Sequence, residues 1–188
     1  MNATQQFEAI KALLGDSGTY YLIAVDMNSN YSYVNKRYAD IFKPIHGDLV
    51  GRHYALTMHP DDQQTCQIVS QMAFKYPDSV FPATLRKYDG QGGFIITRWE
   101  YKAIFDDNGV PAGIYCIGHD ITELMKITGE LQQVKISHSH SVRRHVANLM
   151  GLGKLIQGAN EIGDIQDAAK MIVQSSIDLD EVIKELYK

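Results

Sequence analysis

The chain has 188 residues, enough for one ordinary domain and a smaller appendage. Hydrophobic residues make up 45% of it and charged residues 21%, a composition that excludes a largely disordered protein. Its formal net charge of −4 argues against a nucleic-acid-binding protein, because such proteins present a basic surface.

The cysteines and the apolar runs indicate where the protein resides. Cys66 and Cys116 stand apart in apolar sequence and form neither a disulfide framework nor a metal cage, which favours a reducing compartment. No apolar run reaches the ~20 residues that a membrane-spanning helix needs. The N-terminal residues MNATQQFEAIKALLG lack the basic start and the long apolar stretch of a signal peptide. We therefore expect a soluble, cytoplasmic protein with no membrane span.

The first 120 residues alternate between short helical and strand-like runs. The predicted helical runs are residues 4–14, 36–42 and about 60–74. The predicted strands are residues 20–27, 31–35, 81–88, 94–106 and 112–118. Turn-forming residues join neighbouring strands at 28–30 (NSN), 89–93 (DGQGG) and 106–109 (DDNG). Two strands, a helical middle and three further strands predict an α+β fold with a five-stranded antiparallel sheet.

From Glu123 onward the pattern is that of long helices. Apolar residues recur in steps of three and four, the spacing of a coiled-coil seam, and then take an extra step of four, which is a stutter. The residues of this predicted seam are Leu124, Ile127, Leu131, Val134, His138, Val142, Val146 and Leu149. Residues 157–163 (QGANEIG) predict a turn. A second helix follows, and its apolar stripe consists of Ile165, Ala169, Ile172, Leu179, Ile183 and Leu186.

These patterns divide the chain into three parts: an N-terminal helix over residues 1–18, an α+β domain over 19–122 and a helical hairpin over 123–188. Each helix of the hairpin has an apolar face that one hairpin alone leaves exposed to water. Two hairpins from two chains would close a four-helix bundle, so we expect a homodimer.

Three sequence strings in residues 19–122 resemble those of the PAS family. YSYVNKRYADIF at 31–42 is similar to the segment in which a PAS strand ends in Asn and leads into a small helix. HPDD at 59–62 is similar to the HPxD entry to the long PAS helix, and GHDITE at 118–123 resembles the DIT terminus of a PAS core. Their order and spacing identify a PAS-type sensor domain, whose signal would pass into the helix that begins at Glu123.

A second string, Ser139–Leu152 (SHSVRRHVANLMGL), resembles the phosphoacceptor box of sensor histidine kinases in a SHxVRxPxAxxxGL version. The resemblance implies that His140 accepts the phosphoryl group on a dimerisation and phosphotransfer hairpin. Arg143 and Arg144 would then offset the phosphate charge.

Helical geometry gives a separate indication about His140. If Val142, Val146 and Leu149 point inward, His140 lies about 200° around the helix from the seam and faces solvent. His138 falls on the seam and is instead predicted to be a core or interface residue.

The chain departs from the kinase pattern at three points. Ser141 stands where the family has an acidic residue, and His145 stands where it has a helix-kinking proline. The sequence also ends at Lys188 without an ATP-binding domain, so we expect no independent kinase activity. Phosphate would come from a kinase ATP-binding domain in trans or from a response-regulator receiver domain, unless the sequence is the front end of a longer kinase.

Other possible sites receive weaker support. DGQGG precedes a strand rather than a helix, so it is interpreted as a hairpin turn and not as a nucleotide loop. His138 and His140 point to different faces of their helix, which argues against a metal site. His59 and His119 are assigned structural roles, and the sequence around Cys66 differs from that of a flavin-adduct photosensor. No cofactor is evident, and an unknown ligand of the PAS core remains open.

One set of residues, the strand aromatics, is interpreted as core and sheet surface rather than as a ligand pocket: Tyr20, Tyr21, Tyr31, Tyr33, Trp99 and Tyr101.

The alternative function belongs to a different class of protein, a binding or regulatory module. In it the PAS domain and the hairpin form a dimeric binding or regulatory module without phosphotransfer, and His140 is inert. Ser141 in place of the acidic residue is the main support for this alternative.

Overall fold

The computed structural model describes residues 3–185, and the chain divides into two units, Met1–Met125 and Lys126–Lys188. Leu186, which the sequence predicts in the apolar stripe of the last helix, lies outside the described residues.

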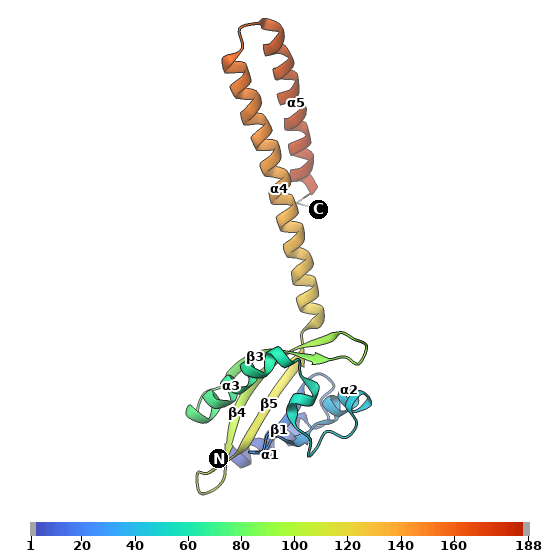
Figure 1. Ribbon diagram of the computed structural model, residues 1–188, viewed down its shortest axis with the longest axis vertical. Coiled ribbons are helices and arrows are strands. Elements are labelled where there is room, and N and C mark those ends of the chain that lie inside the picture. Colours follow the sequence, from blue (N-terminus) through green and yellow to red (C-terminus); the bar gives the residue numbers. More distant parts are fainter. Residues whose placement is uncertain (1–2, 186–188) are drawn as a thin grey trace. The chain divides into compact units, whose positions relative to one another are not determined.

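The first unit is built on one antiparallel sheet (Figure 1). Its strands are β1 (Tyr21–Val25), β2 (Tyr31–Val34), β3 (Phe81–Tyr88), β4 (Phe94–Phe105) and β5 (Pro111–Asp120). Their spatial order is β2-β1-β5-β4-β3, and every neighbouring pair is antiparallel. This confirms the predicted five-stranded α+β fold with its helices inserted between the second and third strands.

The helices of this unit are α1 (Ala3–Leu14), α2 (Lys36–His46), η1 (Tyr54–Thr57), η2 (Pro60–Asp62) and α3 (Gln63–Lys75). Helix α2 extends four residues beyond its predicted end at Phe42 and includes Pro44. The predicted helix over 60–74 is divided, because η2 is a 3₁₀ turn that begins at Pro60 and precedes the α-helical part. Proline is tolerated in a first turn, where its missing N–H would have no partner in any case.

Alternation along the strands gives the sheet two apolar faces. Tyr21 and Ile23 of β1 point into the larger core, which also receives α2 and α3. Leu22 and Ala24, the alternate residues, pack with Phe7 of α1 on the opposite face. This period of two explains why β1 and β5 are apolar almost throughout, since both of their faces are covered.

Asn35 joins three elements at the end of β2. Its Oδ1 accepts from the Tyr38 backbone N–H at 3.1 Å, which caps α2. Its Nδ2 donates to the carbonyls of Leu14 at 2.8 Å and Tyr20 at 3.0 Å. The Asn side chain is only 1% exposed and thereby fixes the ends of α1, β1 and β2 relative to one another.

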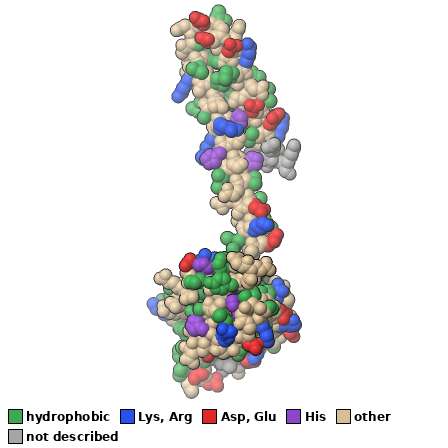
Figure 2. Space-filling model, turned by 45° about the vertical axis from the view of Figure 1, so that its right-hand side comes forward, with side chains coloured by type: hydrophobic (Ala, Val, Ile, Leu, Met, Phe, Trp, Pro, Cys, Tyr) green, Lys and Arg blue, Asp and Glu red, His purple; other side chains and the backbone are tan. Residues whose placement is uncertain are grey.

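The second unit is a pair of antiparallel helices, α4 (Thr122–Gly158) and α5 (Ile162–Glu185), of which α4 begins in the first unit (Figure 1). The turn between them is shorter than the predicted 157–163, because both helices continue into that range. Several hydrophobic side chains of this unit lie at its surface (Figure 2).

The inward face of α4 differs from the predicted seam. His145 is buried, whereas Val146 is 41% exposed. The covered positions that recur along the helix are the buried His145 and the half-buried His138, Val142, Leu149, Leu152 and Ile156, and their neighbours Ser141 and Gly153 are also half-buried. The steps of four and three between the recurring positions form a regular heptad pattern, so within one chain no stutter is needed. The sequence predicts a stutter because Val146 is apolar and His145 is polar, whereas the structure buries His145 and exposes Val146.

The inward face of α5 is likewise displaced from its predicted stripe. Ala168 and Ser175 are buried, and Ile172, Leu179 and Val182 are half-buried. Ala169 and Ile183, which the sequence assigns to this stripe, are exposed. The observed positions again follow steps of three and four, and two of them are small or polar.

Candidate functional site

A cavity of about 220 Å³ lies between the sheet and α3 in the first unit. Its walls come from β1, β3, β4, β5 and α3. Residues of these walls include Ile23, Lys87, Trp99, Tyr101, Ile114, Cys116, Cys66 and Phe74. Its rim includes Met27, Gln67 and Gln71, which are exposed. One water needs only ~10–15 Å³ of such space, so the cavity has room for a small organic molecule.

Lys87 is the charged group of this cavity. It is 2% exposed, and its Nζ donates to Thr57 Oγ1 at 3.1 Å and lies 5.5 Å from the centre of the Trp99 ring. No carboxylate among the described residues forms an ion pair with it. Burial lowers the pKa of Lys87 from 10.5 to about 8, because the interior disfavours the ammonium form.

Thr57 connects Lys87 to a cluster of buried hydroxyl groups. The Thr57 Oγ1 lies 2.8 Å from the Tyr31 hydroxyl and 3.0 Å from the Tyr38 hydroxyl. The two tyrosine hydroxyls are themselves 2.8 Å apart. Burial raises the pKa of Tyr31 to about 12, so the cluster stays neutral and offers no counter-charge to Lys87.

The two cysteines, Cys66 from α3 and Cys116 from β5, both line the cavity and are free thiols. The Cys66 Sγ lies 3.4 Å from the Tyr101 hydroxyl. Burial raises the pKa of the Cys116 thiol, which keeps it protonated and unreactive as a nucleophile.

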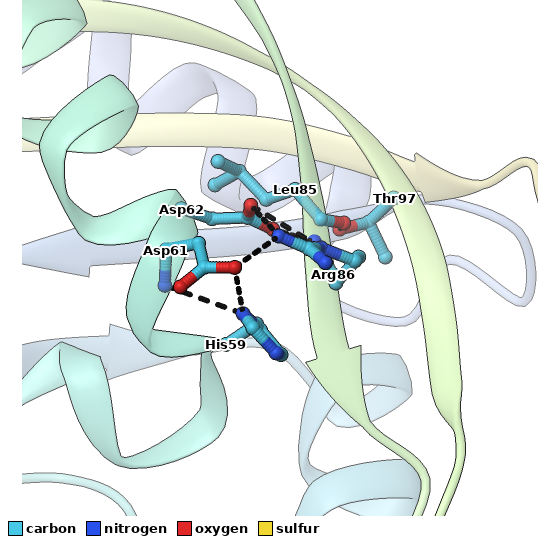
Figure 3. A network of polar contacts seen from close by, with 6 residues as sticks. All are labelled: His59, Asp61, Asp62, Leu85, Arg86 and Thr97. Carbon is cyan, nitrogen blue, oxygen red and sulfur yellow. Dashed lines mark hydrogen bonds and ion pairs between the residues drawn. The ribbon is translucent and has the colours of Figure 1, made fainter.

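The HPDD string forms polar contacts with Arg86 of β3 (Figure 3). None of its four residues lines the cavity. The Asp62 carboxylate accepts from the Arg86 backbone N–H at 2.6 Å and from the Arg86 Nη2 at 2.7 Å. Burial would raise the pKa of Asp62, but these bonds lower it overall. His59 Nδ1 accepts from the Asp61 N–H at 3.2 Å. Asp62 therefore attaches the start of α3 to β3, and the His59 side chain caps the 3₁₀ turn η2 in front of it.

The GHDITE string forms the junction between β5 and α4. The Asp120 Oδ1 accepts from the Thr122 N–H at 2.8 Å and from the Thr122 Oγ1 at 2.6 Å. The Thr122 Oγ1 in turn accepts from the Ile96 N–H at 2.9 Å, which links the start of α4 to β4. A Cβ at Gly118 would lie 2.5 Å from the Trp99 ring, so only glycine permits this close packing beside the cavity.

His140 lies in the second unit, on the exposed surface of α4. Arg143 and Arg144, one turn further along the helix, are also exposed. Ser141 is half-buried, and the nearby Ser139 Oγ donates to the Lys135 carbonyl at 2.8 Å. The structure thus places one imidazole and two guanidinium groups on the solvent-exposed side of one helical segment.

His145 is the buried histidine of the second unit. Its Nδ1 and the Ser175 Oγ are both buried and, within residues 3–185, neither has a hydrogen-bond partner. From the sequence, His145 is interpreted as a replacement for proline and as a possible third member of a metal cluster with His138 and His140, and its burial is not predicted. Its position three residues after Val142, on the heptad, is the signal that would have indicated burial.

Lys87 and Thr57 were not among the predicted site residues. The alternation along β3 could have indicated that Lys87 is buried, because Ala83, Leu85 and Lys87 share one face of the strand and all three are buried.

Trp99 and Tyr101 line the cavity as well as the core, whereas Tyr20 is 44% exposed. DGQGG is a hairpin turn, as predicted, in which Asp89 Oδ1 accepts from the N–H groups of Gln91 and Gly93.

The described residues form neither a metal site nor a membrane-spanning helix. Among residues 3–185, no three His, Cys, Asp or Glu side chains come together as metal ligands would. Within the same range, no helix combines the length and the apolar character needed to cross a bilayer.

The sheet order, the inserted helices and the enclosed cavity place the first unit among α+β domains built on a single antiparallel sheet. The family model that matches residues 16–126 describes the PAS fold, and this match covers more than half of the chain. The chain therefore belongs to the PAS-fold family. No curated protein matches it.

Solved structures support the same fold. A PAS domain from Colwellia psychrerythraea superposes with a TM-score of 0.53 at 16% identity, covering 62% of this chain and 98% of that one. A sensory box histidine kinase/response regulator from Burkholderia thailandensis E264 superposes with a TM-score of 0.50 at 16% identity, covering 68% and 96%. At these identities the likeness concerns the fold alone.

Proposed function

We propose that this chain acts in two-component signal transduction, as a PAS sensor coupled to a dimeric helical hairpin whose His140 accepts a phosphoryl group. The observation that carries the proposal is the exposure of His140 within the SHSVRRHVANLMGL string, next to the exposed Arg143 and Arg144. A second support is the similar fold of the solved structure from Burkholderia thailandensis, which is a sensory box histidine kinase/response regulator.

The chemical step requires an accessible imidazole. A neutral ring nitrogen of His140 forms an N–P bond while the P–O bond to the donor breaks, and the donor leaves with that electron pair. The imidazolium then loses its N–H proton to solvent. Arg143 and Arg144 are positioned one turn away to offset the phosphoryl charge. The donor is a phosphorylated receiver domain or a kinase ATP-binding domain supplied in trans.

The hairpin supports the dimeric part of the proposal through its exposed apolar side chains (Figure 2). Leu124, Leu131 and Val134 of the predicted seam are 61%, 65% and 52% exposed in the single chain. A coiled-coil seam is stable only when a facing helix covers it. A second copy of this chain offers the same seam, and two hairpins complete a four-helix bundle.

Acceptor activity is tested on the full chain with phosphoramidate and with a panel of phosphorylated receiver domains, followed by measurement of acid-labile phosphate on the protein. We expect labelling of the wild type and its loss in His140→Gln. His138→Gln is the matched control, since it removes another imidazole two residues away and should keep the label.

Labelling that persists in His140→Gln would contradict the assignment of this residue. An absence of label with every donor would favour the alternative function, in which the PAS domain and the hairpin form a binding or regulatory module. Ser141 favours that alternative, because it cannot take up the imidazole proton as the usual carboxylate does.

A further inference from the structure

We propose that the cavity of the PAS domain binds a small organic acid, whose carboxylate pairs with the Lys87 ammonium and whose apolar part lies against Trp99 and Ile114. The proposal gives the sensor part of the function above a ligand class. It depends on the described first unit and not on the chemistry of His140.

The first support is the unsatisfied charge of Lys87. An ammonium group has three donors, and the hydrogen bond recorded for this one within residues 3–185 is to the neutral Thr57 hydroxyl. A buried charge normally has an ionic partner or several hydrogen bonds. A carboxylate in the cavity would give the ammonium an ionic partner and would also accept hydrogen bonds from it.

The second support is that the protein itself supplies no substitute anion. The titratable groups around Lys87 include His46 of α2, Tyr54 of η1, Cys66 of α3, Cys116 of β5, Tyr101 of β4 and Asp62 of η2, and of these His46 can only add positive charge. The Cys116 thiol and the Tyr101 hydroxyl are kept neutral by burial, which raises the pKa of each. The Asp62 carboxylate is occupied by Arg86.

Asp26 is the carboxylate that lines the cavity itself. Its Oδ1 accepts from the N–H groups of Asn28 at 2.9 Å and Asn30 at 2.8 Å, so it closes the turn between β1 and β2. It has no ion pair with Lys87 among the described residues.

The third support is the size and lining of the space. A cavity of about 220 Å³ is below the ~300–1,000 Å³ of sites for drug-sized ligands, which favours a small acid. Aromatic and aliphatic side chains form most of its wall, and Lys87 is the one cationic residue in that wall. Few polar groups in an apolar wall are typical of sites that fix the orientation of a small molecule.

The test uses the full chain and four acids, acetate, butyrate, hexanoate and benzoate, each paired with its uncharged amide of the same size. Binding is measured by isothermal titration calorimetry and by the rise in melting temperature. We expect at least one acid to bind ~10-fold or more tightly than its amide, since the amide cannot pair with the ammonium. If no acid is preferred over its amide, the proposal is overturned.

Substitutions test whether Lys87 is responsible for binding the acid. Lys87→Met should remove the preference for the acid, whereas Lys75→Met, which removes an exposed lysine of α3, should retain it. Acid binding that is unchanged in Lys87→Met would overturn the proposal. Ser70→Trp keeps Lys87 but places an indole at the half-buried rim of the cavity, so it should abolish binding even if Lys87→Met does not fold.

A pH series separates ion pairing from apolar binding. The acids stay ionised above pH 6, whereas Lys87 loses its proton near pH 8. Affinity for the acid should therefore be about 10-fold weaker at pH 9 than at pH 7, and affinity for the amide should change little. Phosphotransfer to His140 is read separately, so failure of either proposal leaves the other standing.

Discussion

Lys87 shows how one side chain can be costly to the fold and useful to a site. Its ammonium is removed from water with one neutral hydrogen-bond partner, Thr57, and the face of the Trp99 ring, and without an anionic partner this burial destabilises the fold. The surrounding Tyr31, Tyr38 and Thr57 hydroxyls are satisfied among themselves. A buried ammonium group that destabilises the core is expected where a function requires its charge.

The cost of Lys87 predicts a dependence of stability on pH. Below pH 8 both folded and unfolded chains hold the proton, so the full cost applies. Between about pH 8 and 10.5 only the unfolded chain holds it, so this residue makes the fold more stable as pH rises. At pH 7, Lys87→Met should therefore be the more stable protein, and its advantage should shrink by roughly 3 kcal/mol by pH 10.5.

The measurement is the free energy of unfolding in urea for the wild type and for Lys87→Met across this pH range. Lys75→Met serves as the control, because it removes a lysine that is exposed rather than buried and should not reproduce the effect of the substitution at residue 87. A constant difference between Lys87→Met and the wild type would mean that residue 87 is solvated in solution.

The sequence predicts that the hairpin has two helices and roughly where each begins and ends. It does not predict which side of each helix faces inward. A run of residues without proline from Glu123 to Ile156, with apolar residues in steps of three and four, predicts a long helix. The choice between positions 145 and 146 for the inward face could not be made from polarity. A histidine can be buried when its neighbours on the heptad are large and the residue that faces it on the other helix, here Ser175, is small.

The buried His145 predicts a stabilising substitution. Its Nδ1 and the Ser175 Oγ lack hydrogen-bond partners within the described chain, and such groups cost about 1–3 kcal/mol each. Replacing both by apolar residues, as in His145→Leu/Ser175→Ala, should raise the free energy of unfolding by about 1–3 kcal/mol.

Urea unfolding followed by helical circular dichroism measures this change. His140→Leu is the control, because it replaces an exposed histidine of the same helix and should bring no comparable gain. A loss of stability in the double variant would show that the two polar groups are satisfied in the assembled protein.

For the whole molecule, the proposed dimer has the clearest consequence. Leu131 and Val134 are 65% and 52% exposed in one chain, so charges placed there leave the packing of that chain undisturbed. In a dimer the same charges would be buried without partners. Leu131→Glu/Val134→Glu should therefore weaken dimerisation by about 10-fold or more while the helical content stays unchanged.

Sedimentation equilibrium over a range of concentrations measures the dissociation constant. Gln132→Glu/Gln133→Glu adds the same charge to two exposed neighbours on the same helix and should leave the dimer intact. A wild-type chain that is monomeric at tens of micromolar would refute the four-helix bundle and with it this part of the proposed function.

Local patterns were sufficient for the strands, the helices, the hairpin turns and the order of the elements. Each of these depends on residues close together in the sequence, through side-chain periodicity and turn chemistry. The sheet order, the cavity and the isolated ammonium of Lys87 could not be derived in this way. They arise when β3, β4, β5, α3 and η1 come together, and which groups then lack a partner is decided by neighbours from distant parts of the chain.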